Sequence, residues 1–225
     1  MNERDAILGR ISEALKIAAP VPGEHDHHAP PARDLRDFSK WLPPVGADFE
    51  QQVELFRANS VELKTDFRLL DSAEDVAVAL EELKVGNGWQ GLISHGGTLT
   101  NAALAKIGLP VLLTDGGYDV NAMEKCDAGI TECDFLVAQT GTVVITNRSA
   151  GGRALSVLPP HHVVIARREQ LIPDLPTAFA LLKKKYEGNY PSMISLVTGP
   201  SRTGDIERIL VLGAHGPKKL TVLCY

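Results

Sequence analysis

The stretch GLISHGGTLTNAALAKIGLPVLLTD, residues 91–115, sets the expected fold of this chain. Its two apolar runs, GLIS and PVLLTD, predict short strands, and HGGTLTNAALAKIG between them predicts a glycine-containing turn followed by a helix. Short apolar strands that alternate with helices are typical of a parallel sheet covered on both faces. The stretch therefore indicates an α/β fold, with an open, largely parallel sheet and helices on both faces.

The same alternation continues on both sides of this stretch. Towards the N-terminus, helices are expected over 47–62 and 72–86, the second capped by Ser72, and a strand is expected at 67–70. Towards the C-terminus, the pattern predicts helices at 120–128, 173–188 and 200–210, a hairpin at 135–147, and strands at 158–166, 192–199 and 218–225. Asp174 is the expected N-cap of the helix at 173–188.

Residues 1–34 are expected to lie outside the main domain, which is predicted to span 35–225. Apolar residues at helical spacing in 3–16 predict a short amphipathic helix that is not stable alone, so we expect it to dock on another surface. The segment that follows is rich in Pro, His and charge, which is typical of a linker. Its run HDHH at 25–28 suits zinc or nickel by residue type, but the linker composition favours a solvated segment and no metal site is expected.

Charge and cysteine content argue against several classes of protein. The 225 residues carry a formal net charge of −5 and no dense run of Lys or Arg, so neither nucleic acid nor an acidic membrane is an expected partner. The chain has neither the apolar core of a signal peptide nor a stretch long enough to cross a bilayer, and a cytoplasmic location is expected. Cys126, Cys133 and Cys224 form no Cys-x-x-Cys pair, so we expect reduced structural thiols rather than disulfides or an iron-sulfur site.

The segment TGPSRTGDIERILVLGAHGP, residues 198–217, contains the leading candidate for an anion site. A strand that ends at Gly199 and a helix that opens after it would place backbone N–H groups and the Arg202 guanidinium around a phosphate or carboxylate. Asp205 is then a residue that orients Arg202, while Ser201 and Thr203 either cap the helix or contact the ligand. The alternative is that these two hydroxyls only cap the helix and that Arg202 pairs with Asp205 on the surface.

His215 lies in the turn Gly-Ala-His-Gly-Pro of the same segment. Histidine changes its charge near neutral pH, so His215 is a candidate acid, base or hydrogen-bond donor. A turn histidine whose ring is satisfied by backbone carbonyls is the alternative.

Two carboxylates two residues apart, Glu132 and Asp134, precede a Thr-Gly-Thr turn. Such a pair can divide into acid and base roles, or both groups can remain ionised and solvated in a polar loop. Arg153 is a second candidate anion ligand, and His162 or His161 is expected to face the same crevice. HGGT at 95–98 resembles a phosphate-binding loop only weakly, because it lacks the spacing and the lysine of a P-loop.

Three motifs, GITECDFLVAQTGTVVI (129–145), RALSVLPPHHVVIA (153–166) and the segment from 198 to the C-terminus, together resemble the lactate-utilisation (LUD) domain of the LutC/YkgG group. The resemblance implies a fold like that of the NagB/RpiA/CoA-transferase group. It also implies a role with two partner proteins in oxidising L-lactate to pyruvate. The iron-sulfur clusters are then expected in the partner subunits, and no cofactor is expected in this chain.

The resemblance also marks positions of this chain as candidate site residues. The candidates for catalysis are Asp134 and His215. The candidates for ligand binding are Thr140, Gly141, Thr142, Arg153, His162, Gly199, Ser201, Arg202, Thr203 and Asp205, and further positions that match the motifs are Pro200, Glu207, Gly216 and Pro217. Gln139 stands where the family often has an acidic residue, and an amide cannot take a proton at neutral pH.

Three functional hypotheses follow. The first is the non-cluster subunit of an iron-sulfur L-lactate-oxidising system that binds a small carboxylate or phosphate-bearing ligand near Arg202. The second is a free-standing enzyme of the sugar-phosphate isomerase or CoA-transferase type, which rests on fold analogy. The third is a regulatory or assembly module whose N-terminal helix docks on another subunit.

Overall fold

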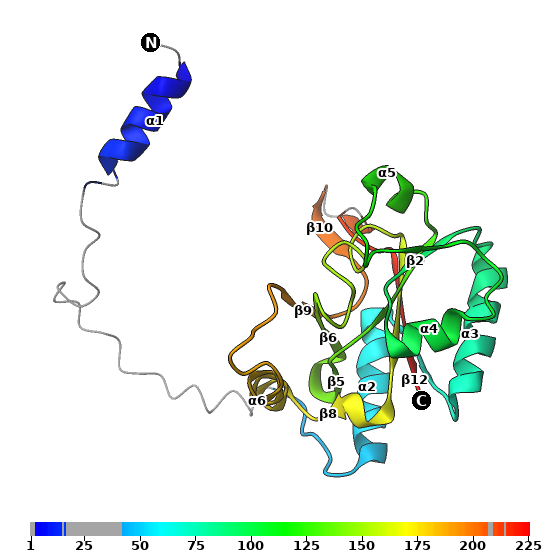
Figure 1. Cartoon of the computed structure of the whole chain (residues 1–225). Helices are drawn as coiled ribbons and strands as arrows, with labels where there is room; N and C mark the ends of the chain where they lie inside the picture. The colour runs from blue at the N-terminus through cyan, green and yellow to red at the C-terminus, as the bar shows by residue number, and fades with distance from the viewer. Residues whose placement is uncertain (1–2, 15, 17–41, 207–208, 214) are drawn as a thin grey trace. The chain divides into compact units, whose positions relative to one another are not determined.

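The computed structural model describes residues 3–14, 16, 42–206, 209–213 and 215–225 (Figure 1). The chain divides into two compact units, Met1–Lys40 and Trp41–Tyr225. In the first unit, α1 (Glu3–Ala14) is the helix expected near the N-terminus. The run at 25–28 that was considered for metal binding lies outside the described residues. Every candidate site residue belongs to the second unit.

The second unit is built on a six-stranded sheet in which every neighbouring pair of strands is parallel. The strands, in the spatial order β1-β12-β7-β4-β2-β3, are β1 (Asp66–Leu69), β12 (Lys219–Cys224), β7 (His161–Ala166), β4 (Ala128–Glu132), β2 (Leu92–Ser94) and β3 (Val111–Leu113). The predicted open, largely parallel sheet is confirmed.

Helices α3 (Ala73–Asn87) and α4 (Thr98–Leu104) cover one face of this sheet (Figure 1). The side chain of Ser72 accepts a hydrogen bond from the backbone of Asp75, which confirms the predicted N-cap of α3. Gly88 ends α3 in the left-handed conformation that favours glycine. The short helix α5 (Val120–Met123) follows β3, and Met123 packs with Ile93 beneath it.

The other face carries a second, smaller sheet together with a helix, α2 (Phe49–Leu63). The small sheet has the order β8-β5-β6-β9, and its strands are β8 (Leu171–Ile172), β5 (Phe135–Val137), β6 (Thr142–Thr146) and β9 (Ile194–Val197). Two short 3-10 helices, η2 (Ala138–Thr140) and η3 (Arg168–Gln170), adjoin β5 and β8. The predicted hairpin around the Thr-Gly turn is the antiparallel pair β5 and β6.

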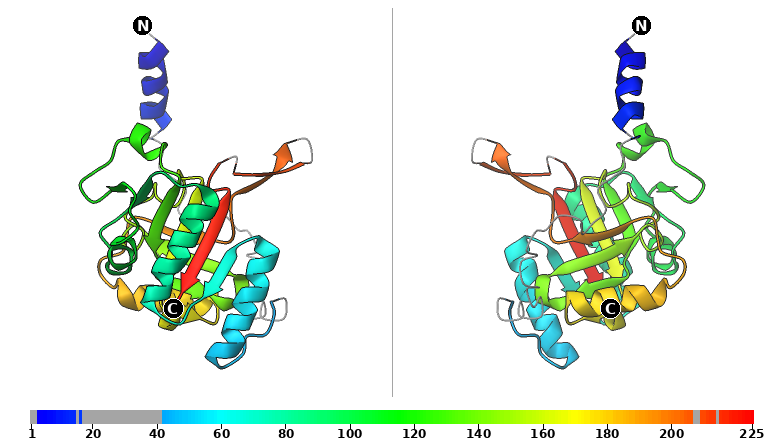
Figure 2. Two further views of the ribbon diagram at one scale, coloured as in Figure 1. Left: turned by 90° about the vertical axis from the view of Figure 1, so that its right-hand side faces the viewer. Right: turned by 90° about the vertical axis from the view of Figure 1, so that its left-hand side faces the viewer.

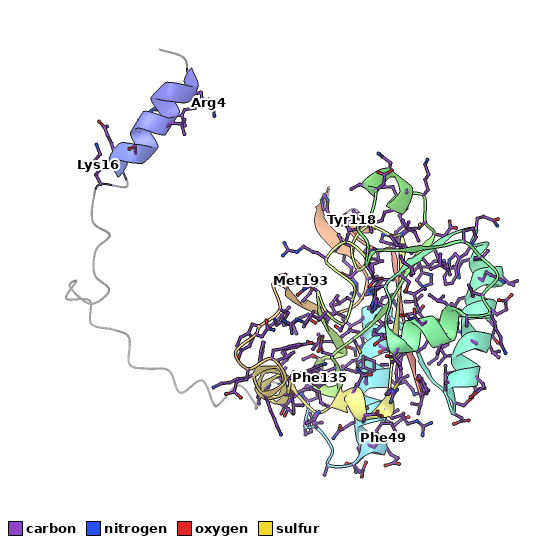
Figure 3. All side chains as sticks on the ribbon, viewed as in Figure 1. Arg4, Lys16, Phe49, Tyr118, Phe135 and Met193 are labelled. Atoms are coloured by element: carbon purple, nitrogen blue, oxygen red, sulfur yellow. The ribbon has the colours of Figure 1, made fainter. Side chains whose placement is uncertain are left out.

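Strand β7 shows how one element separates two cores. Val164 and Ala166 pack towards α2 and the small sheet, whereas Val163 and Ile165 pack towards α3 and α4. Helix α6 (Leu175–Lys185), with the predicted N-cap Asp174, covers the outer side of the small sheet. Figure 3 shows Phe135 of β5 beside this helix.

The prediction of a short helix at 200–210 is wrong. This segment instead contributes to an antiparallel hairpin formed by β10 (Arg202–Ile206) and β11 (Ile209–Leu212), which extends away from the start of β12 (Figure 2). The sequence contains a glycine at 204 and β-branched residues at 203, 206, 209 and 211, which favour strands and disfavour helices. An anion site at the N-terminus of a helix therefore does not exist at this position.

The strand order also locates the topological switch point of the large sheet. From β2 the chain passes to the edge strand β3, whereas β4 lies on the opposite side of β2 and leads to β7. Crevices at the carboxyl ends of strands whose connections diverge in this way are the usual ligand sites of open α/β sheets. In this chain that position lies between the ends of β2 and β4.

Candidate functional site

Arg202 and the Thr-Gly-Thr turn meet at the C-terminal end of α2. A side-chain nitrogen of Arg202, Nη2, donates hydrogen bonds to the carbonyl oxygens of Leu63 and Glu62. The last carbonyls of a helix have no partner within the helix, so a guanidinium at this point caps them. Arg202 therefore caps the carbonyl groups at the C-terminus of α2. The sequence had instead predicted that it binds an anion at the N-terminus of a helix.

Two glycines allow this close packing. Gly141 has φ 62° and Gly199 has φ 87°, a region that residues with a side chain rarely adopt. A Cβ atom on Gly199 would lie 3.0 Å from the carbonyl oxygen of Leu63. The hydroxyls of Thr140, Thr142 and Thr198 form a chain beside these glycines, with 2.8 Å between each pair of neighbouring oxygens.

A groove of about 600 Å³ opens beside Arg202. It lies at the amino ends of β1, β7 and β12, whereas a carboxyl-end crevice was expected for this segment. The lining residues are Lys64, Asp66, Leu83, Asn87, His161, Pro200, Arg202, Lys218, Lys219, Leu220 and Thr221. Its volume falls within the range of about 300 to 1,000 Å³ that is usual for small-molecule sites.

The groove has an excess of positive charge. Among the described residues, Lys64, Lys218, Lys219 and Arg202 form no ion pair with a carboxylate. The one carboxylate of the lining, that of Asp66, lies 3.0 Å from a guanidinium nitrogen of Arg68. With no carboxylate partner among the described residues, these cations can pair with an anionic ligand.

His161 lies at the floor of this groove, with only 4% of its surface exposed. Its Nε2 is hydrogen-bonded to the hydroxyl of Thr221 at 2.9 Å, and that hydroxyl donates to a carboxylate oxygen of Asp66 at 3.5 Å. The other ring nitrogen, Nδ1, is buried without a hydrogen-bond partner in the described structure. Burial lowers the pKa of His161 to about 4, and the charge of Lys219 adds to this effect, so the ring is neutral at pH 7.

Asp134, a candidate for catalysis, is buried in a network of three donors. Its two carboxylate oxygens accept hydrogen bonds from Lys185 Nζ at 2.7 Å, from the Tyr186 hydroxyl at 2.6 Å and from the Ser149 hydroxyl at 2.7 Å. Burial opposes ionisation, but these hydrogen bonds outweigh it and hold the pKa of Asp134 below its ordinary value. The ionised side chain is therefore fully hydrogen-bonded and links the β5–β6 hairpin region to α6. It is not solvated in a polar loop.

At the switch point, the carboxylate of Glu132 lies where an anionic ligand would otherwise bind. Glu132 ends β4, and its Oε1 accepts hydrogen bonds from the backbone N–H groups of Leu99 at 2.7 Å and Thr100 at 3.3 Å. A Cβ atom on Gly97 would collide with this carboxylate, which explains the glycine there. His95 lies beside it, 95% buried, and burial lowers the pKa of this histidine. The first turn of α4, which follows the HGGT turn, thus binds a side chain of the same protein.

The lining of the groove does not include His162, Arg153, His215 or Gln139. His162 is fully buried, with its Nε2 2.9 Å from the hydroxyl of Thr131, while Arg153 and His215 are exposed. Gln139 donates a hydrogen bond to the carbonyl of Pro43 at 3.0 Å. Backbone hydrogen bonds join Ser201 to Pro217 and Gly213, beside Gly216, and the side chains of Thr203, Asp205 and Glu207 lie outside the described residues.

Sequence reasoning missed most of the groove. It named His161 only as an alternative to His162, and it named none of Lys64, Lys218 and Lys219. The adjacent lysines at 218 and 219 open a predicted strand, which was a weak signal for the rim of the groove. Lys64 and Asp66 had no signal, because their position depends on how β1 pairs with β12.

The described part of the chain contains no group of three or more His, Cys, Asp or Glu side chains arranged to hold a metal ion. Cys126, Cys133 and Cys224 are free and buried. Within the same residues, no helix combines the length and the apolar character that crossing a membrane requires.

Comparison with known proteins places this architecture. The sequence pattern of the LUD domain matches residues 120–225. Lactate utilization protein C of Geobacillus kaustophilus is 38% identical over 97% of this chain and 94% of its own length, and the protein of the same name from Shouchella clausii is 28% identical over 100% and 97%. A crystal structure of a DUF162 family protein from Deinococcus radiodurans is similar with a TM-score of 0.61 and 20% identity, over 80% of this chain and 99% of that one.

The mostly parallel sheet and the matched C-terminal half define a LUD-domain protein. The similarity extends well beyond that half, since the relative from Geobacillus kaustophilus aligns over almost the whole chain. The chain belongs to the lactate utilization protein C family.

Proposed function

We propose that this chain acts in lactate utilisation as the non-cluster subunit of an iron-sulfur system that oxidises L-lactate to pyruvate. The observation that carries the proposal is the kinship with proteins named lactate utilization protein C over nearly the full length of both chains. Because the alignment covers both the N-terminal region and the LUD domain, it favours a shared role for the whole protein.

The chemistry of the reaction supports a division of work between subunits. Oxidation of L-lactate to pyruvate releases two electrons and two protons, so an electron acceptor is required. This chain has only three cysteines, fewer than the four thiolates that usually hold an iron-sulfur cluster. Clusters in partner subunits would supply the acceptor, while this chain contributes cations that can bind an anion.

A co-purification experiment tests the proposal. The tagged chain is recovered anaerobically from its source cells after growth on L-lactate, and the eluate is assayed for iron content and lactate-dependent dye reduction. We expect iron-sulfur proteins to co-purify with this activity, and the isolated chain to lack it. Recovery of a lone, inactive chain from lactate-grown cells would contradict the proposal, and turnover of a phosphosugar or CoA ester by that chain would replace it with the free-standing enzyme.

A matched pair of arginine variants then tests the role of the groove in the complex. Arg202→Ala removes a cation of the groove, whereas Arg153→Ala removes an exposed arginine outside it. We expect Arg202→Ala alone to lower the activity of the purified complex, with both variants still folded and still associated. Equal activity of the two variants would exclude Arg202 from the site.

A further inference from the structure

We propose that the groove at the amino ends of β1, β7 and β12 binds an organic phosphate. The proposal deepens the anion-binding part of the proposed function by naming a ligand class other than lactate. It rests on three independent features of the described residues, which are cations without a carboxylate partner, a strained lysine and a buried ring nitrogen without a hydrogen-bond partner.

The first feature is the number of unpaired cations. Lys64 at the end of α2, Arg202 at the start of β10, and Lys218 and Lys219 at the start of β12 all line one groove. None of them is paired with a carboxylate among the residues that the structure describes. A monocarboxylate offers a single charge to such a set, whereas a phosphate monoester carries almost two charges and three acceptor oxygens at pH 7.

The second feature is the backbone conformation of Lys64. It caps the C-terminus of α2 with φ 64° and ψ 32°, and it is the only described residue other than glycine with a positive φ. The equivalent cap of α3 is Gly88, which adopts the same conformation without strain. Strain of this kind persists at functional sites, where the side chain is needed. The strain at residue 64 therefore indicates that the Lys64 ammonium group has a binding role at this wall of the groove.

The third feature is the unsatisfied Nδ1 of His161. A buried polar atom without a partner is costly, and a native structure usually satisfies it. An ionised carboxylate only accepts hydrogen bonds, so the Thr221 hydroxyl gives its proton to Asp66 and takes one from Nε2 of His161. Nδ1 then carries a lone pair, so the partner that it lacks is a hydrogen-bond donor such as a hydroxyl or an amine.

The size and lining of the groove favour an organic phosphate over inorganic phosphate or a three-carbon acid. A volume of about 600 Å³ accommodates a ligand of sugar or nucleoside size. Leu83, Pro200 and Leu220 provide an apolar part of the wall against which a carbon framework can pack. Lys219 is held in place by a hydrogen bond of 2.5 Å from its Nζ to Asn87 Oδ1, so its charge is directed before the ligand binds.

The experiment uses the isolated full-length chain and needs no partner protein. Binding of ribose 5-phosphate and adenosine monophosphate is measured by calorimetry, with inorganic phosphate and L-lactate as comparison ligands. The variants are Lys219→Ala and Lys64→Gly, and the matched control is Lys183→Ala, which removes an exposed lysine of α6. Thermal unfolding of each variant without ligand reports its stability.

We expect at least one organic phosphate to bind, with an affinity that falls as salt rises, and Lys219→Ala and Lys64→Gly to weaken it by about tenfold or more. Lys64→Gly is expected to raise the melting temperature while it weakens binding, which a purely structural role for Lys64 would not produce. Lys183→Ala is expected to bind as the unaltered chain does.

Three results would overturn the proposal. The first is the absence of saturable binding of both organic phosphates to the unaltered chain at millimolar concentration. The second is an affinity that Lys219→Ala leaves unchanged, and the third is L-lactate binding that is tighter and equally dependent on Lys219. Because no partner protein or redox assay is involved, these results leave the lactate-oxidising proposal to its own test.

Discussion

Two buried neutral histidines make the stability of this protein depend on pH well above the range in which carboxylates titrate. Burial lowers the pKa of His161 to about 4 and that of His162 to about 3, from an ordinary value of 6.5. In the unfolded chain both rings take up a proton below pH 6.5, whereas in the folded chain they stay neutral. Their contribution to stability is therefore complete above pH 6.5 and is lost as the pH falls towards 4 and then 3.

The size of the effect follows from these pKa values. Between pH 7.5 and 5 each histidine lowers the free energy of unfolding by roughly 2 kcal/mol, because one pKa unit corresponds to about 1.36 kcal/mol. The two together remove roughly 4 kcal/mol, a large part of the 5–15 kcal/mol that is typical of a folded domain. Near pH 5 the slope approaches about 2.7 kcal/mol per pH unit, and His95, whose pKa burial also lowers, adds in the same direction.

Urea denaturation at pH 7.5, 6.5, 5.5 and 5.0 measures this slope. His162→Gln removes one of the two buried titrating rings and is expected to reduce the slope by about 1.4 kcal/mol per pH unit, whatever its effect on stability at pH 7.5. His215→Gln, a change at an exposed position, serves as the matched control and is expected to keep the slope. NMR titration of the folded chain provides a direct check on both rings. A native His162 ring that titrates near pH 6.5, or a slope that His162→Gln does not change, would refute the reasoning.

Three further predictions concern folding and are checked by urea denaturation at pH 7.5. Asp134→Asn weakens a buried network that includes Lys185, and it is expected to lower the free energy of unfolding by about 3 kcal/mol; a loss below 1 kcal/mol would contradict a structural role. Gly97→Ala forces a Cβ atom against the carboxylate of Glu132 and is expected to cost about 2 kcal/mol, most of which the double variant with Glu132→Ala recovers. Ile145→Val in the fully buried β6 is expected to cost about 1 kcal/mol, and no loss would mean that this core is loosely packed.

Several elements of the fold were predictable because each has a strong local pattern. The strand at 91–94, the helix capped by Ser72 and the hairpin around Gly141 depend on apolar periodicity, a cap and a turn, all of which lie within a few residues. Strand β4 was not identified, because in sequence it runs directly into the β5–β6 hairpin. The segment that forms the hairpin at 202–212 was predicted as a helix, since its β-branched residues at 203, 206, 209 and 211 do not alternate regularly.

The candidate site was less predictable, since its geometry depends on contacts between distant segments. Arg202 was identified as an anion ligand, but its place beside α2 follows from a hydrogen bond to Leu63, 139 residues away. The relay from Asp66 through Thr221 to His161 requires three strands to pair in the observed register. A sequence motif can identify such residues, but the pairing of the strands in the large sheet is what places them side by side.

The burial of the cysteines determines how the protein reacts with thiol reagents. Burial raises the pKa of the Cys133 thiol well above its ordinary value and that of Cys224 to about 11, so both are protonated at pH 7.5. Since the thiolate is the reactive form, neither alkylating agents nor peroxide can modify these residues while the core is closed. The rate at which Cys133 and Cys224 become labelled therefore measures how often the core between the two sheets opens.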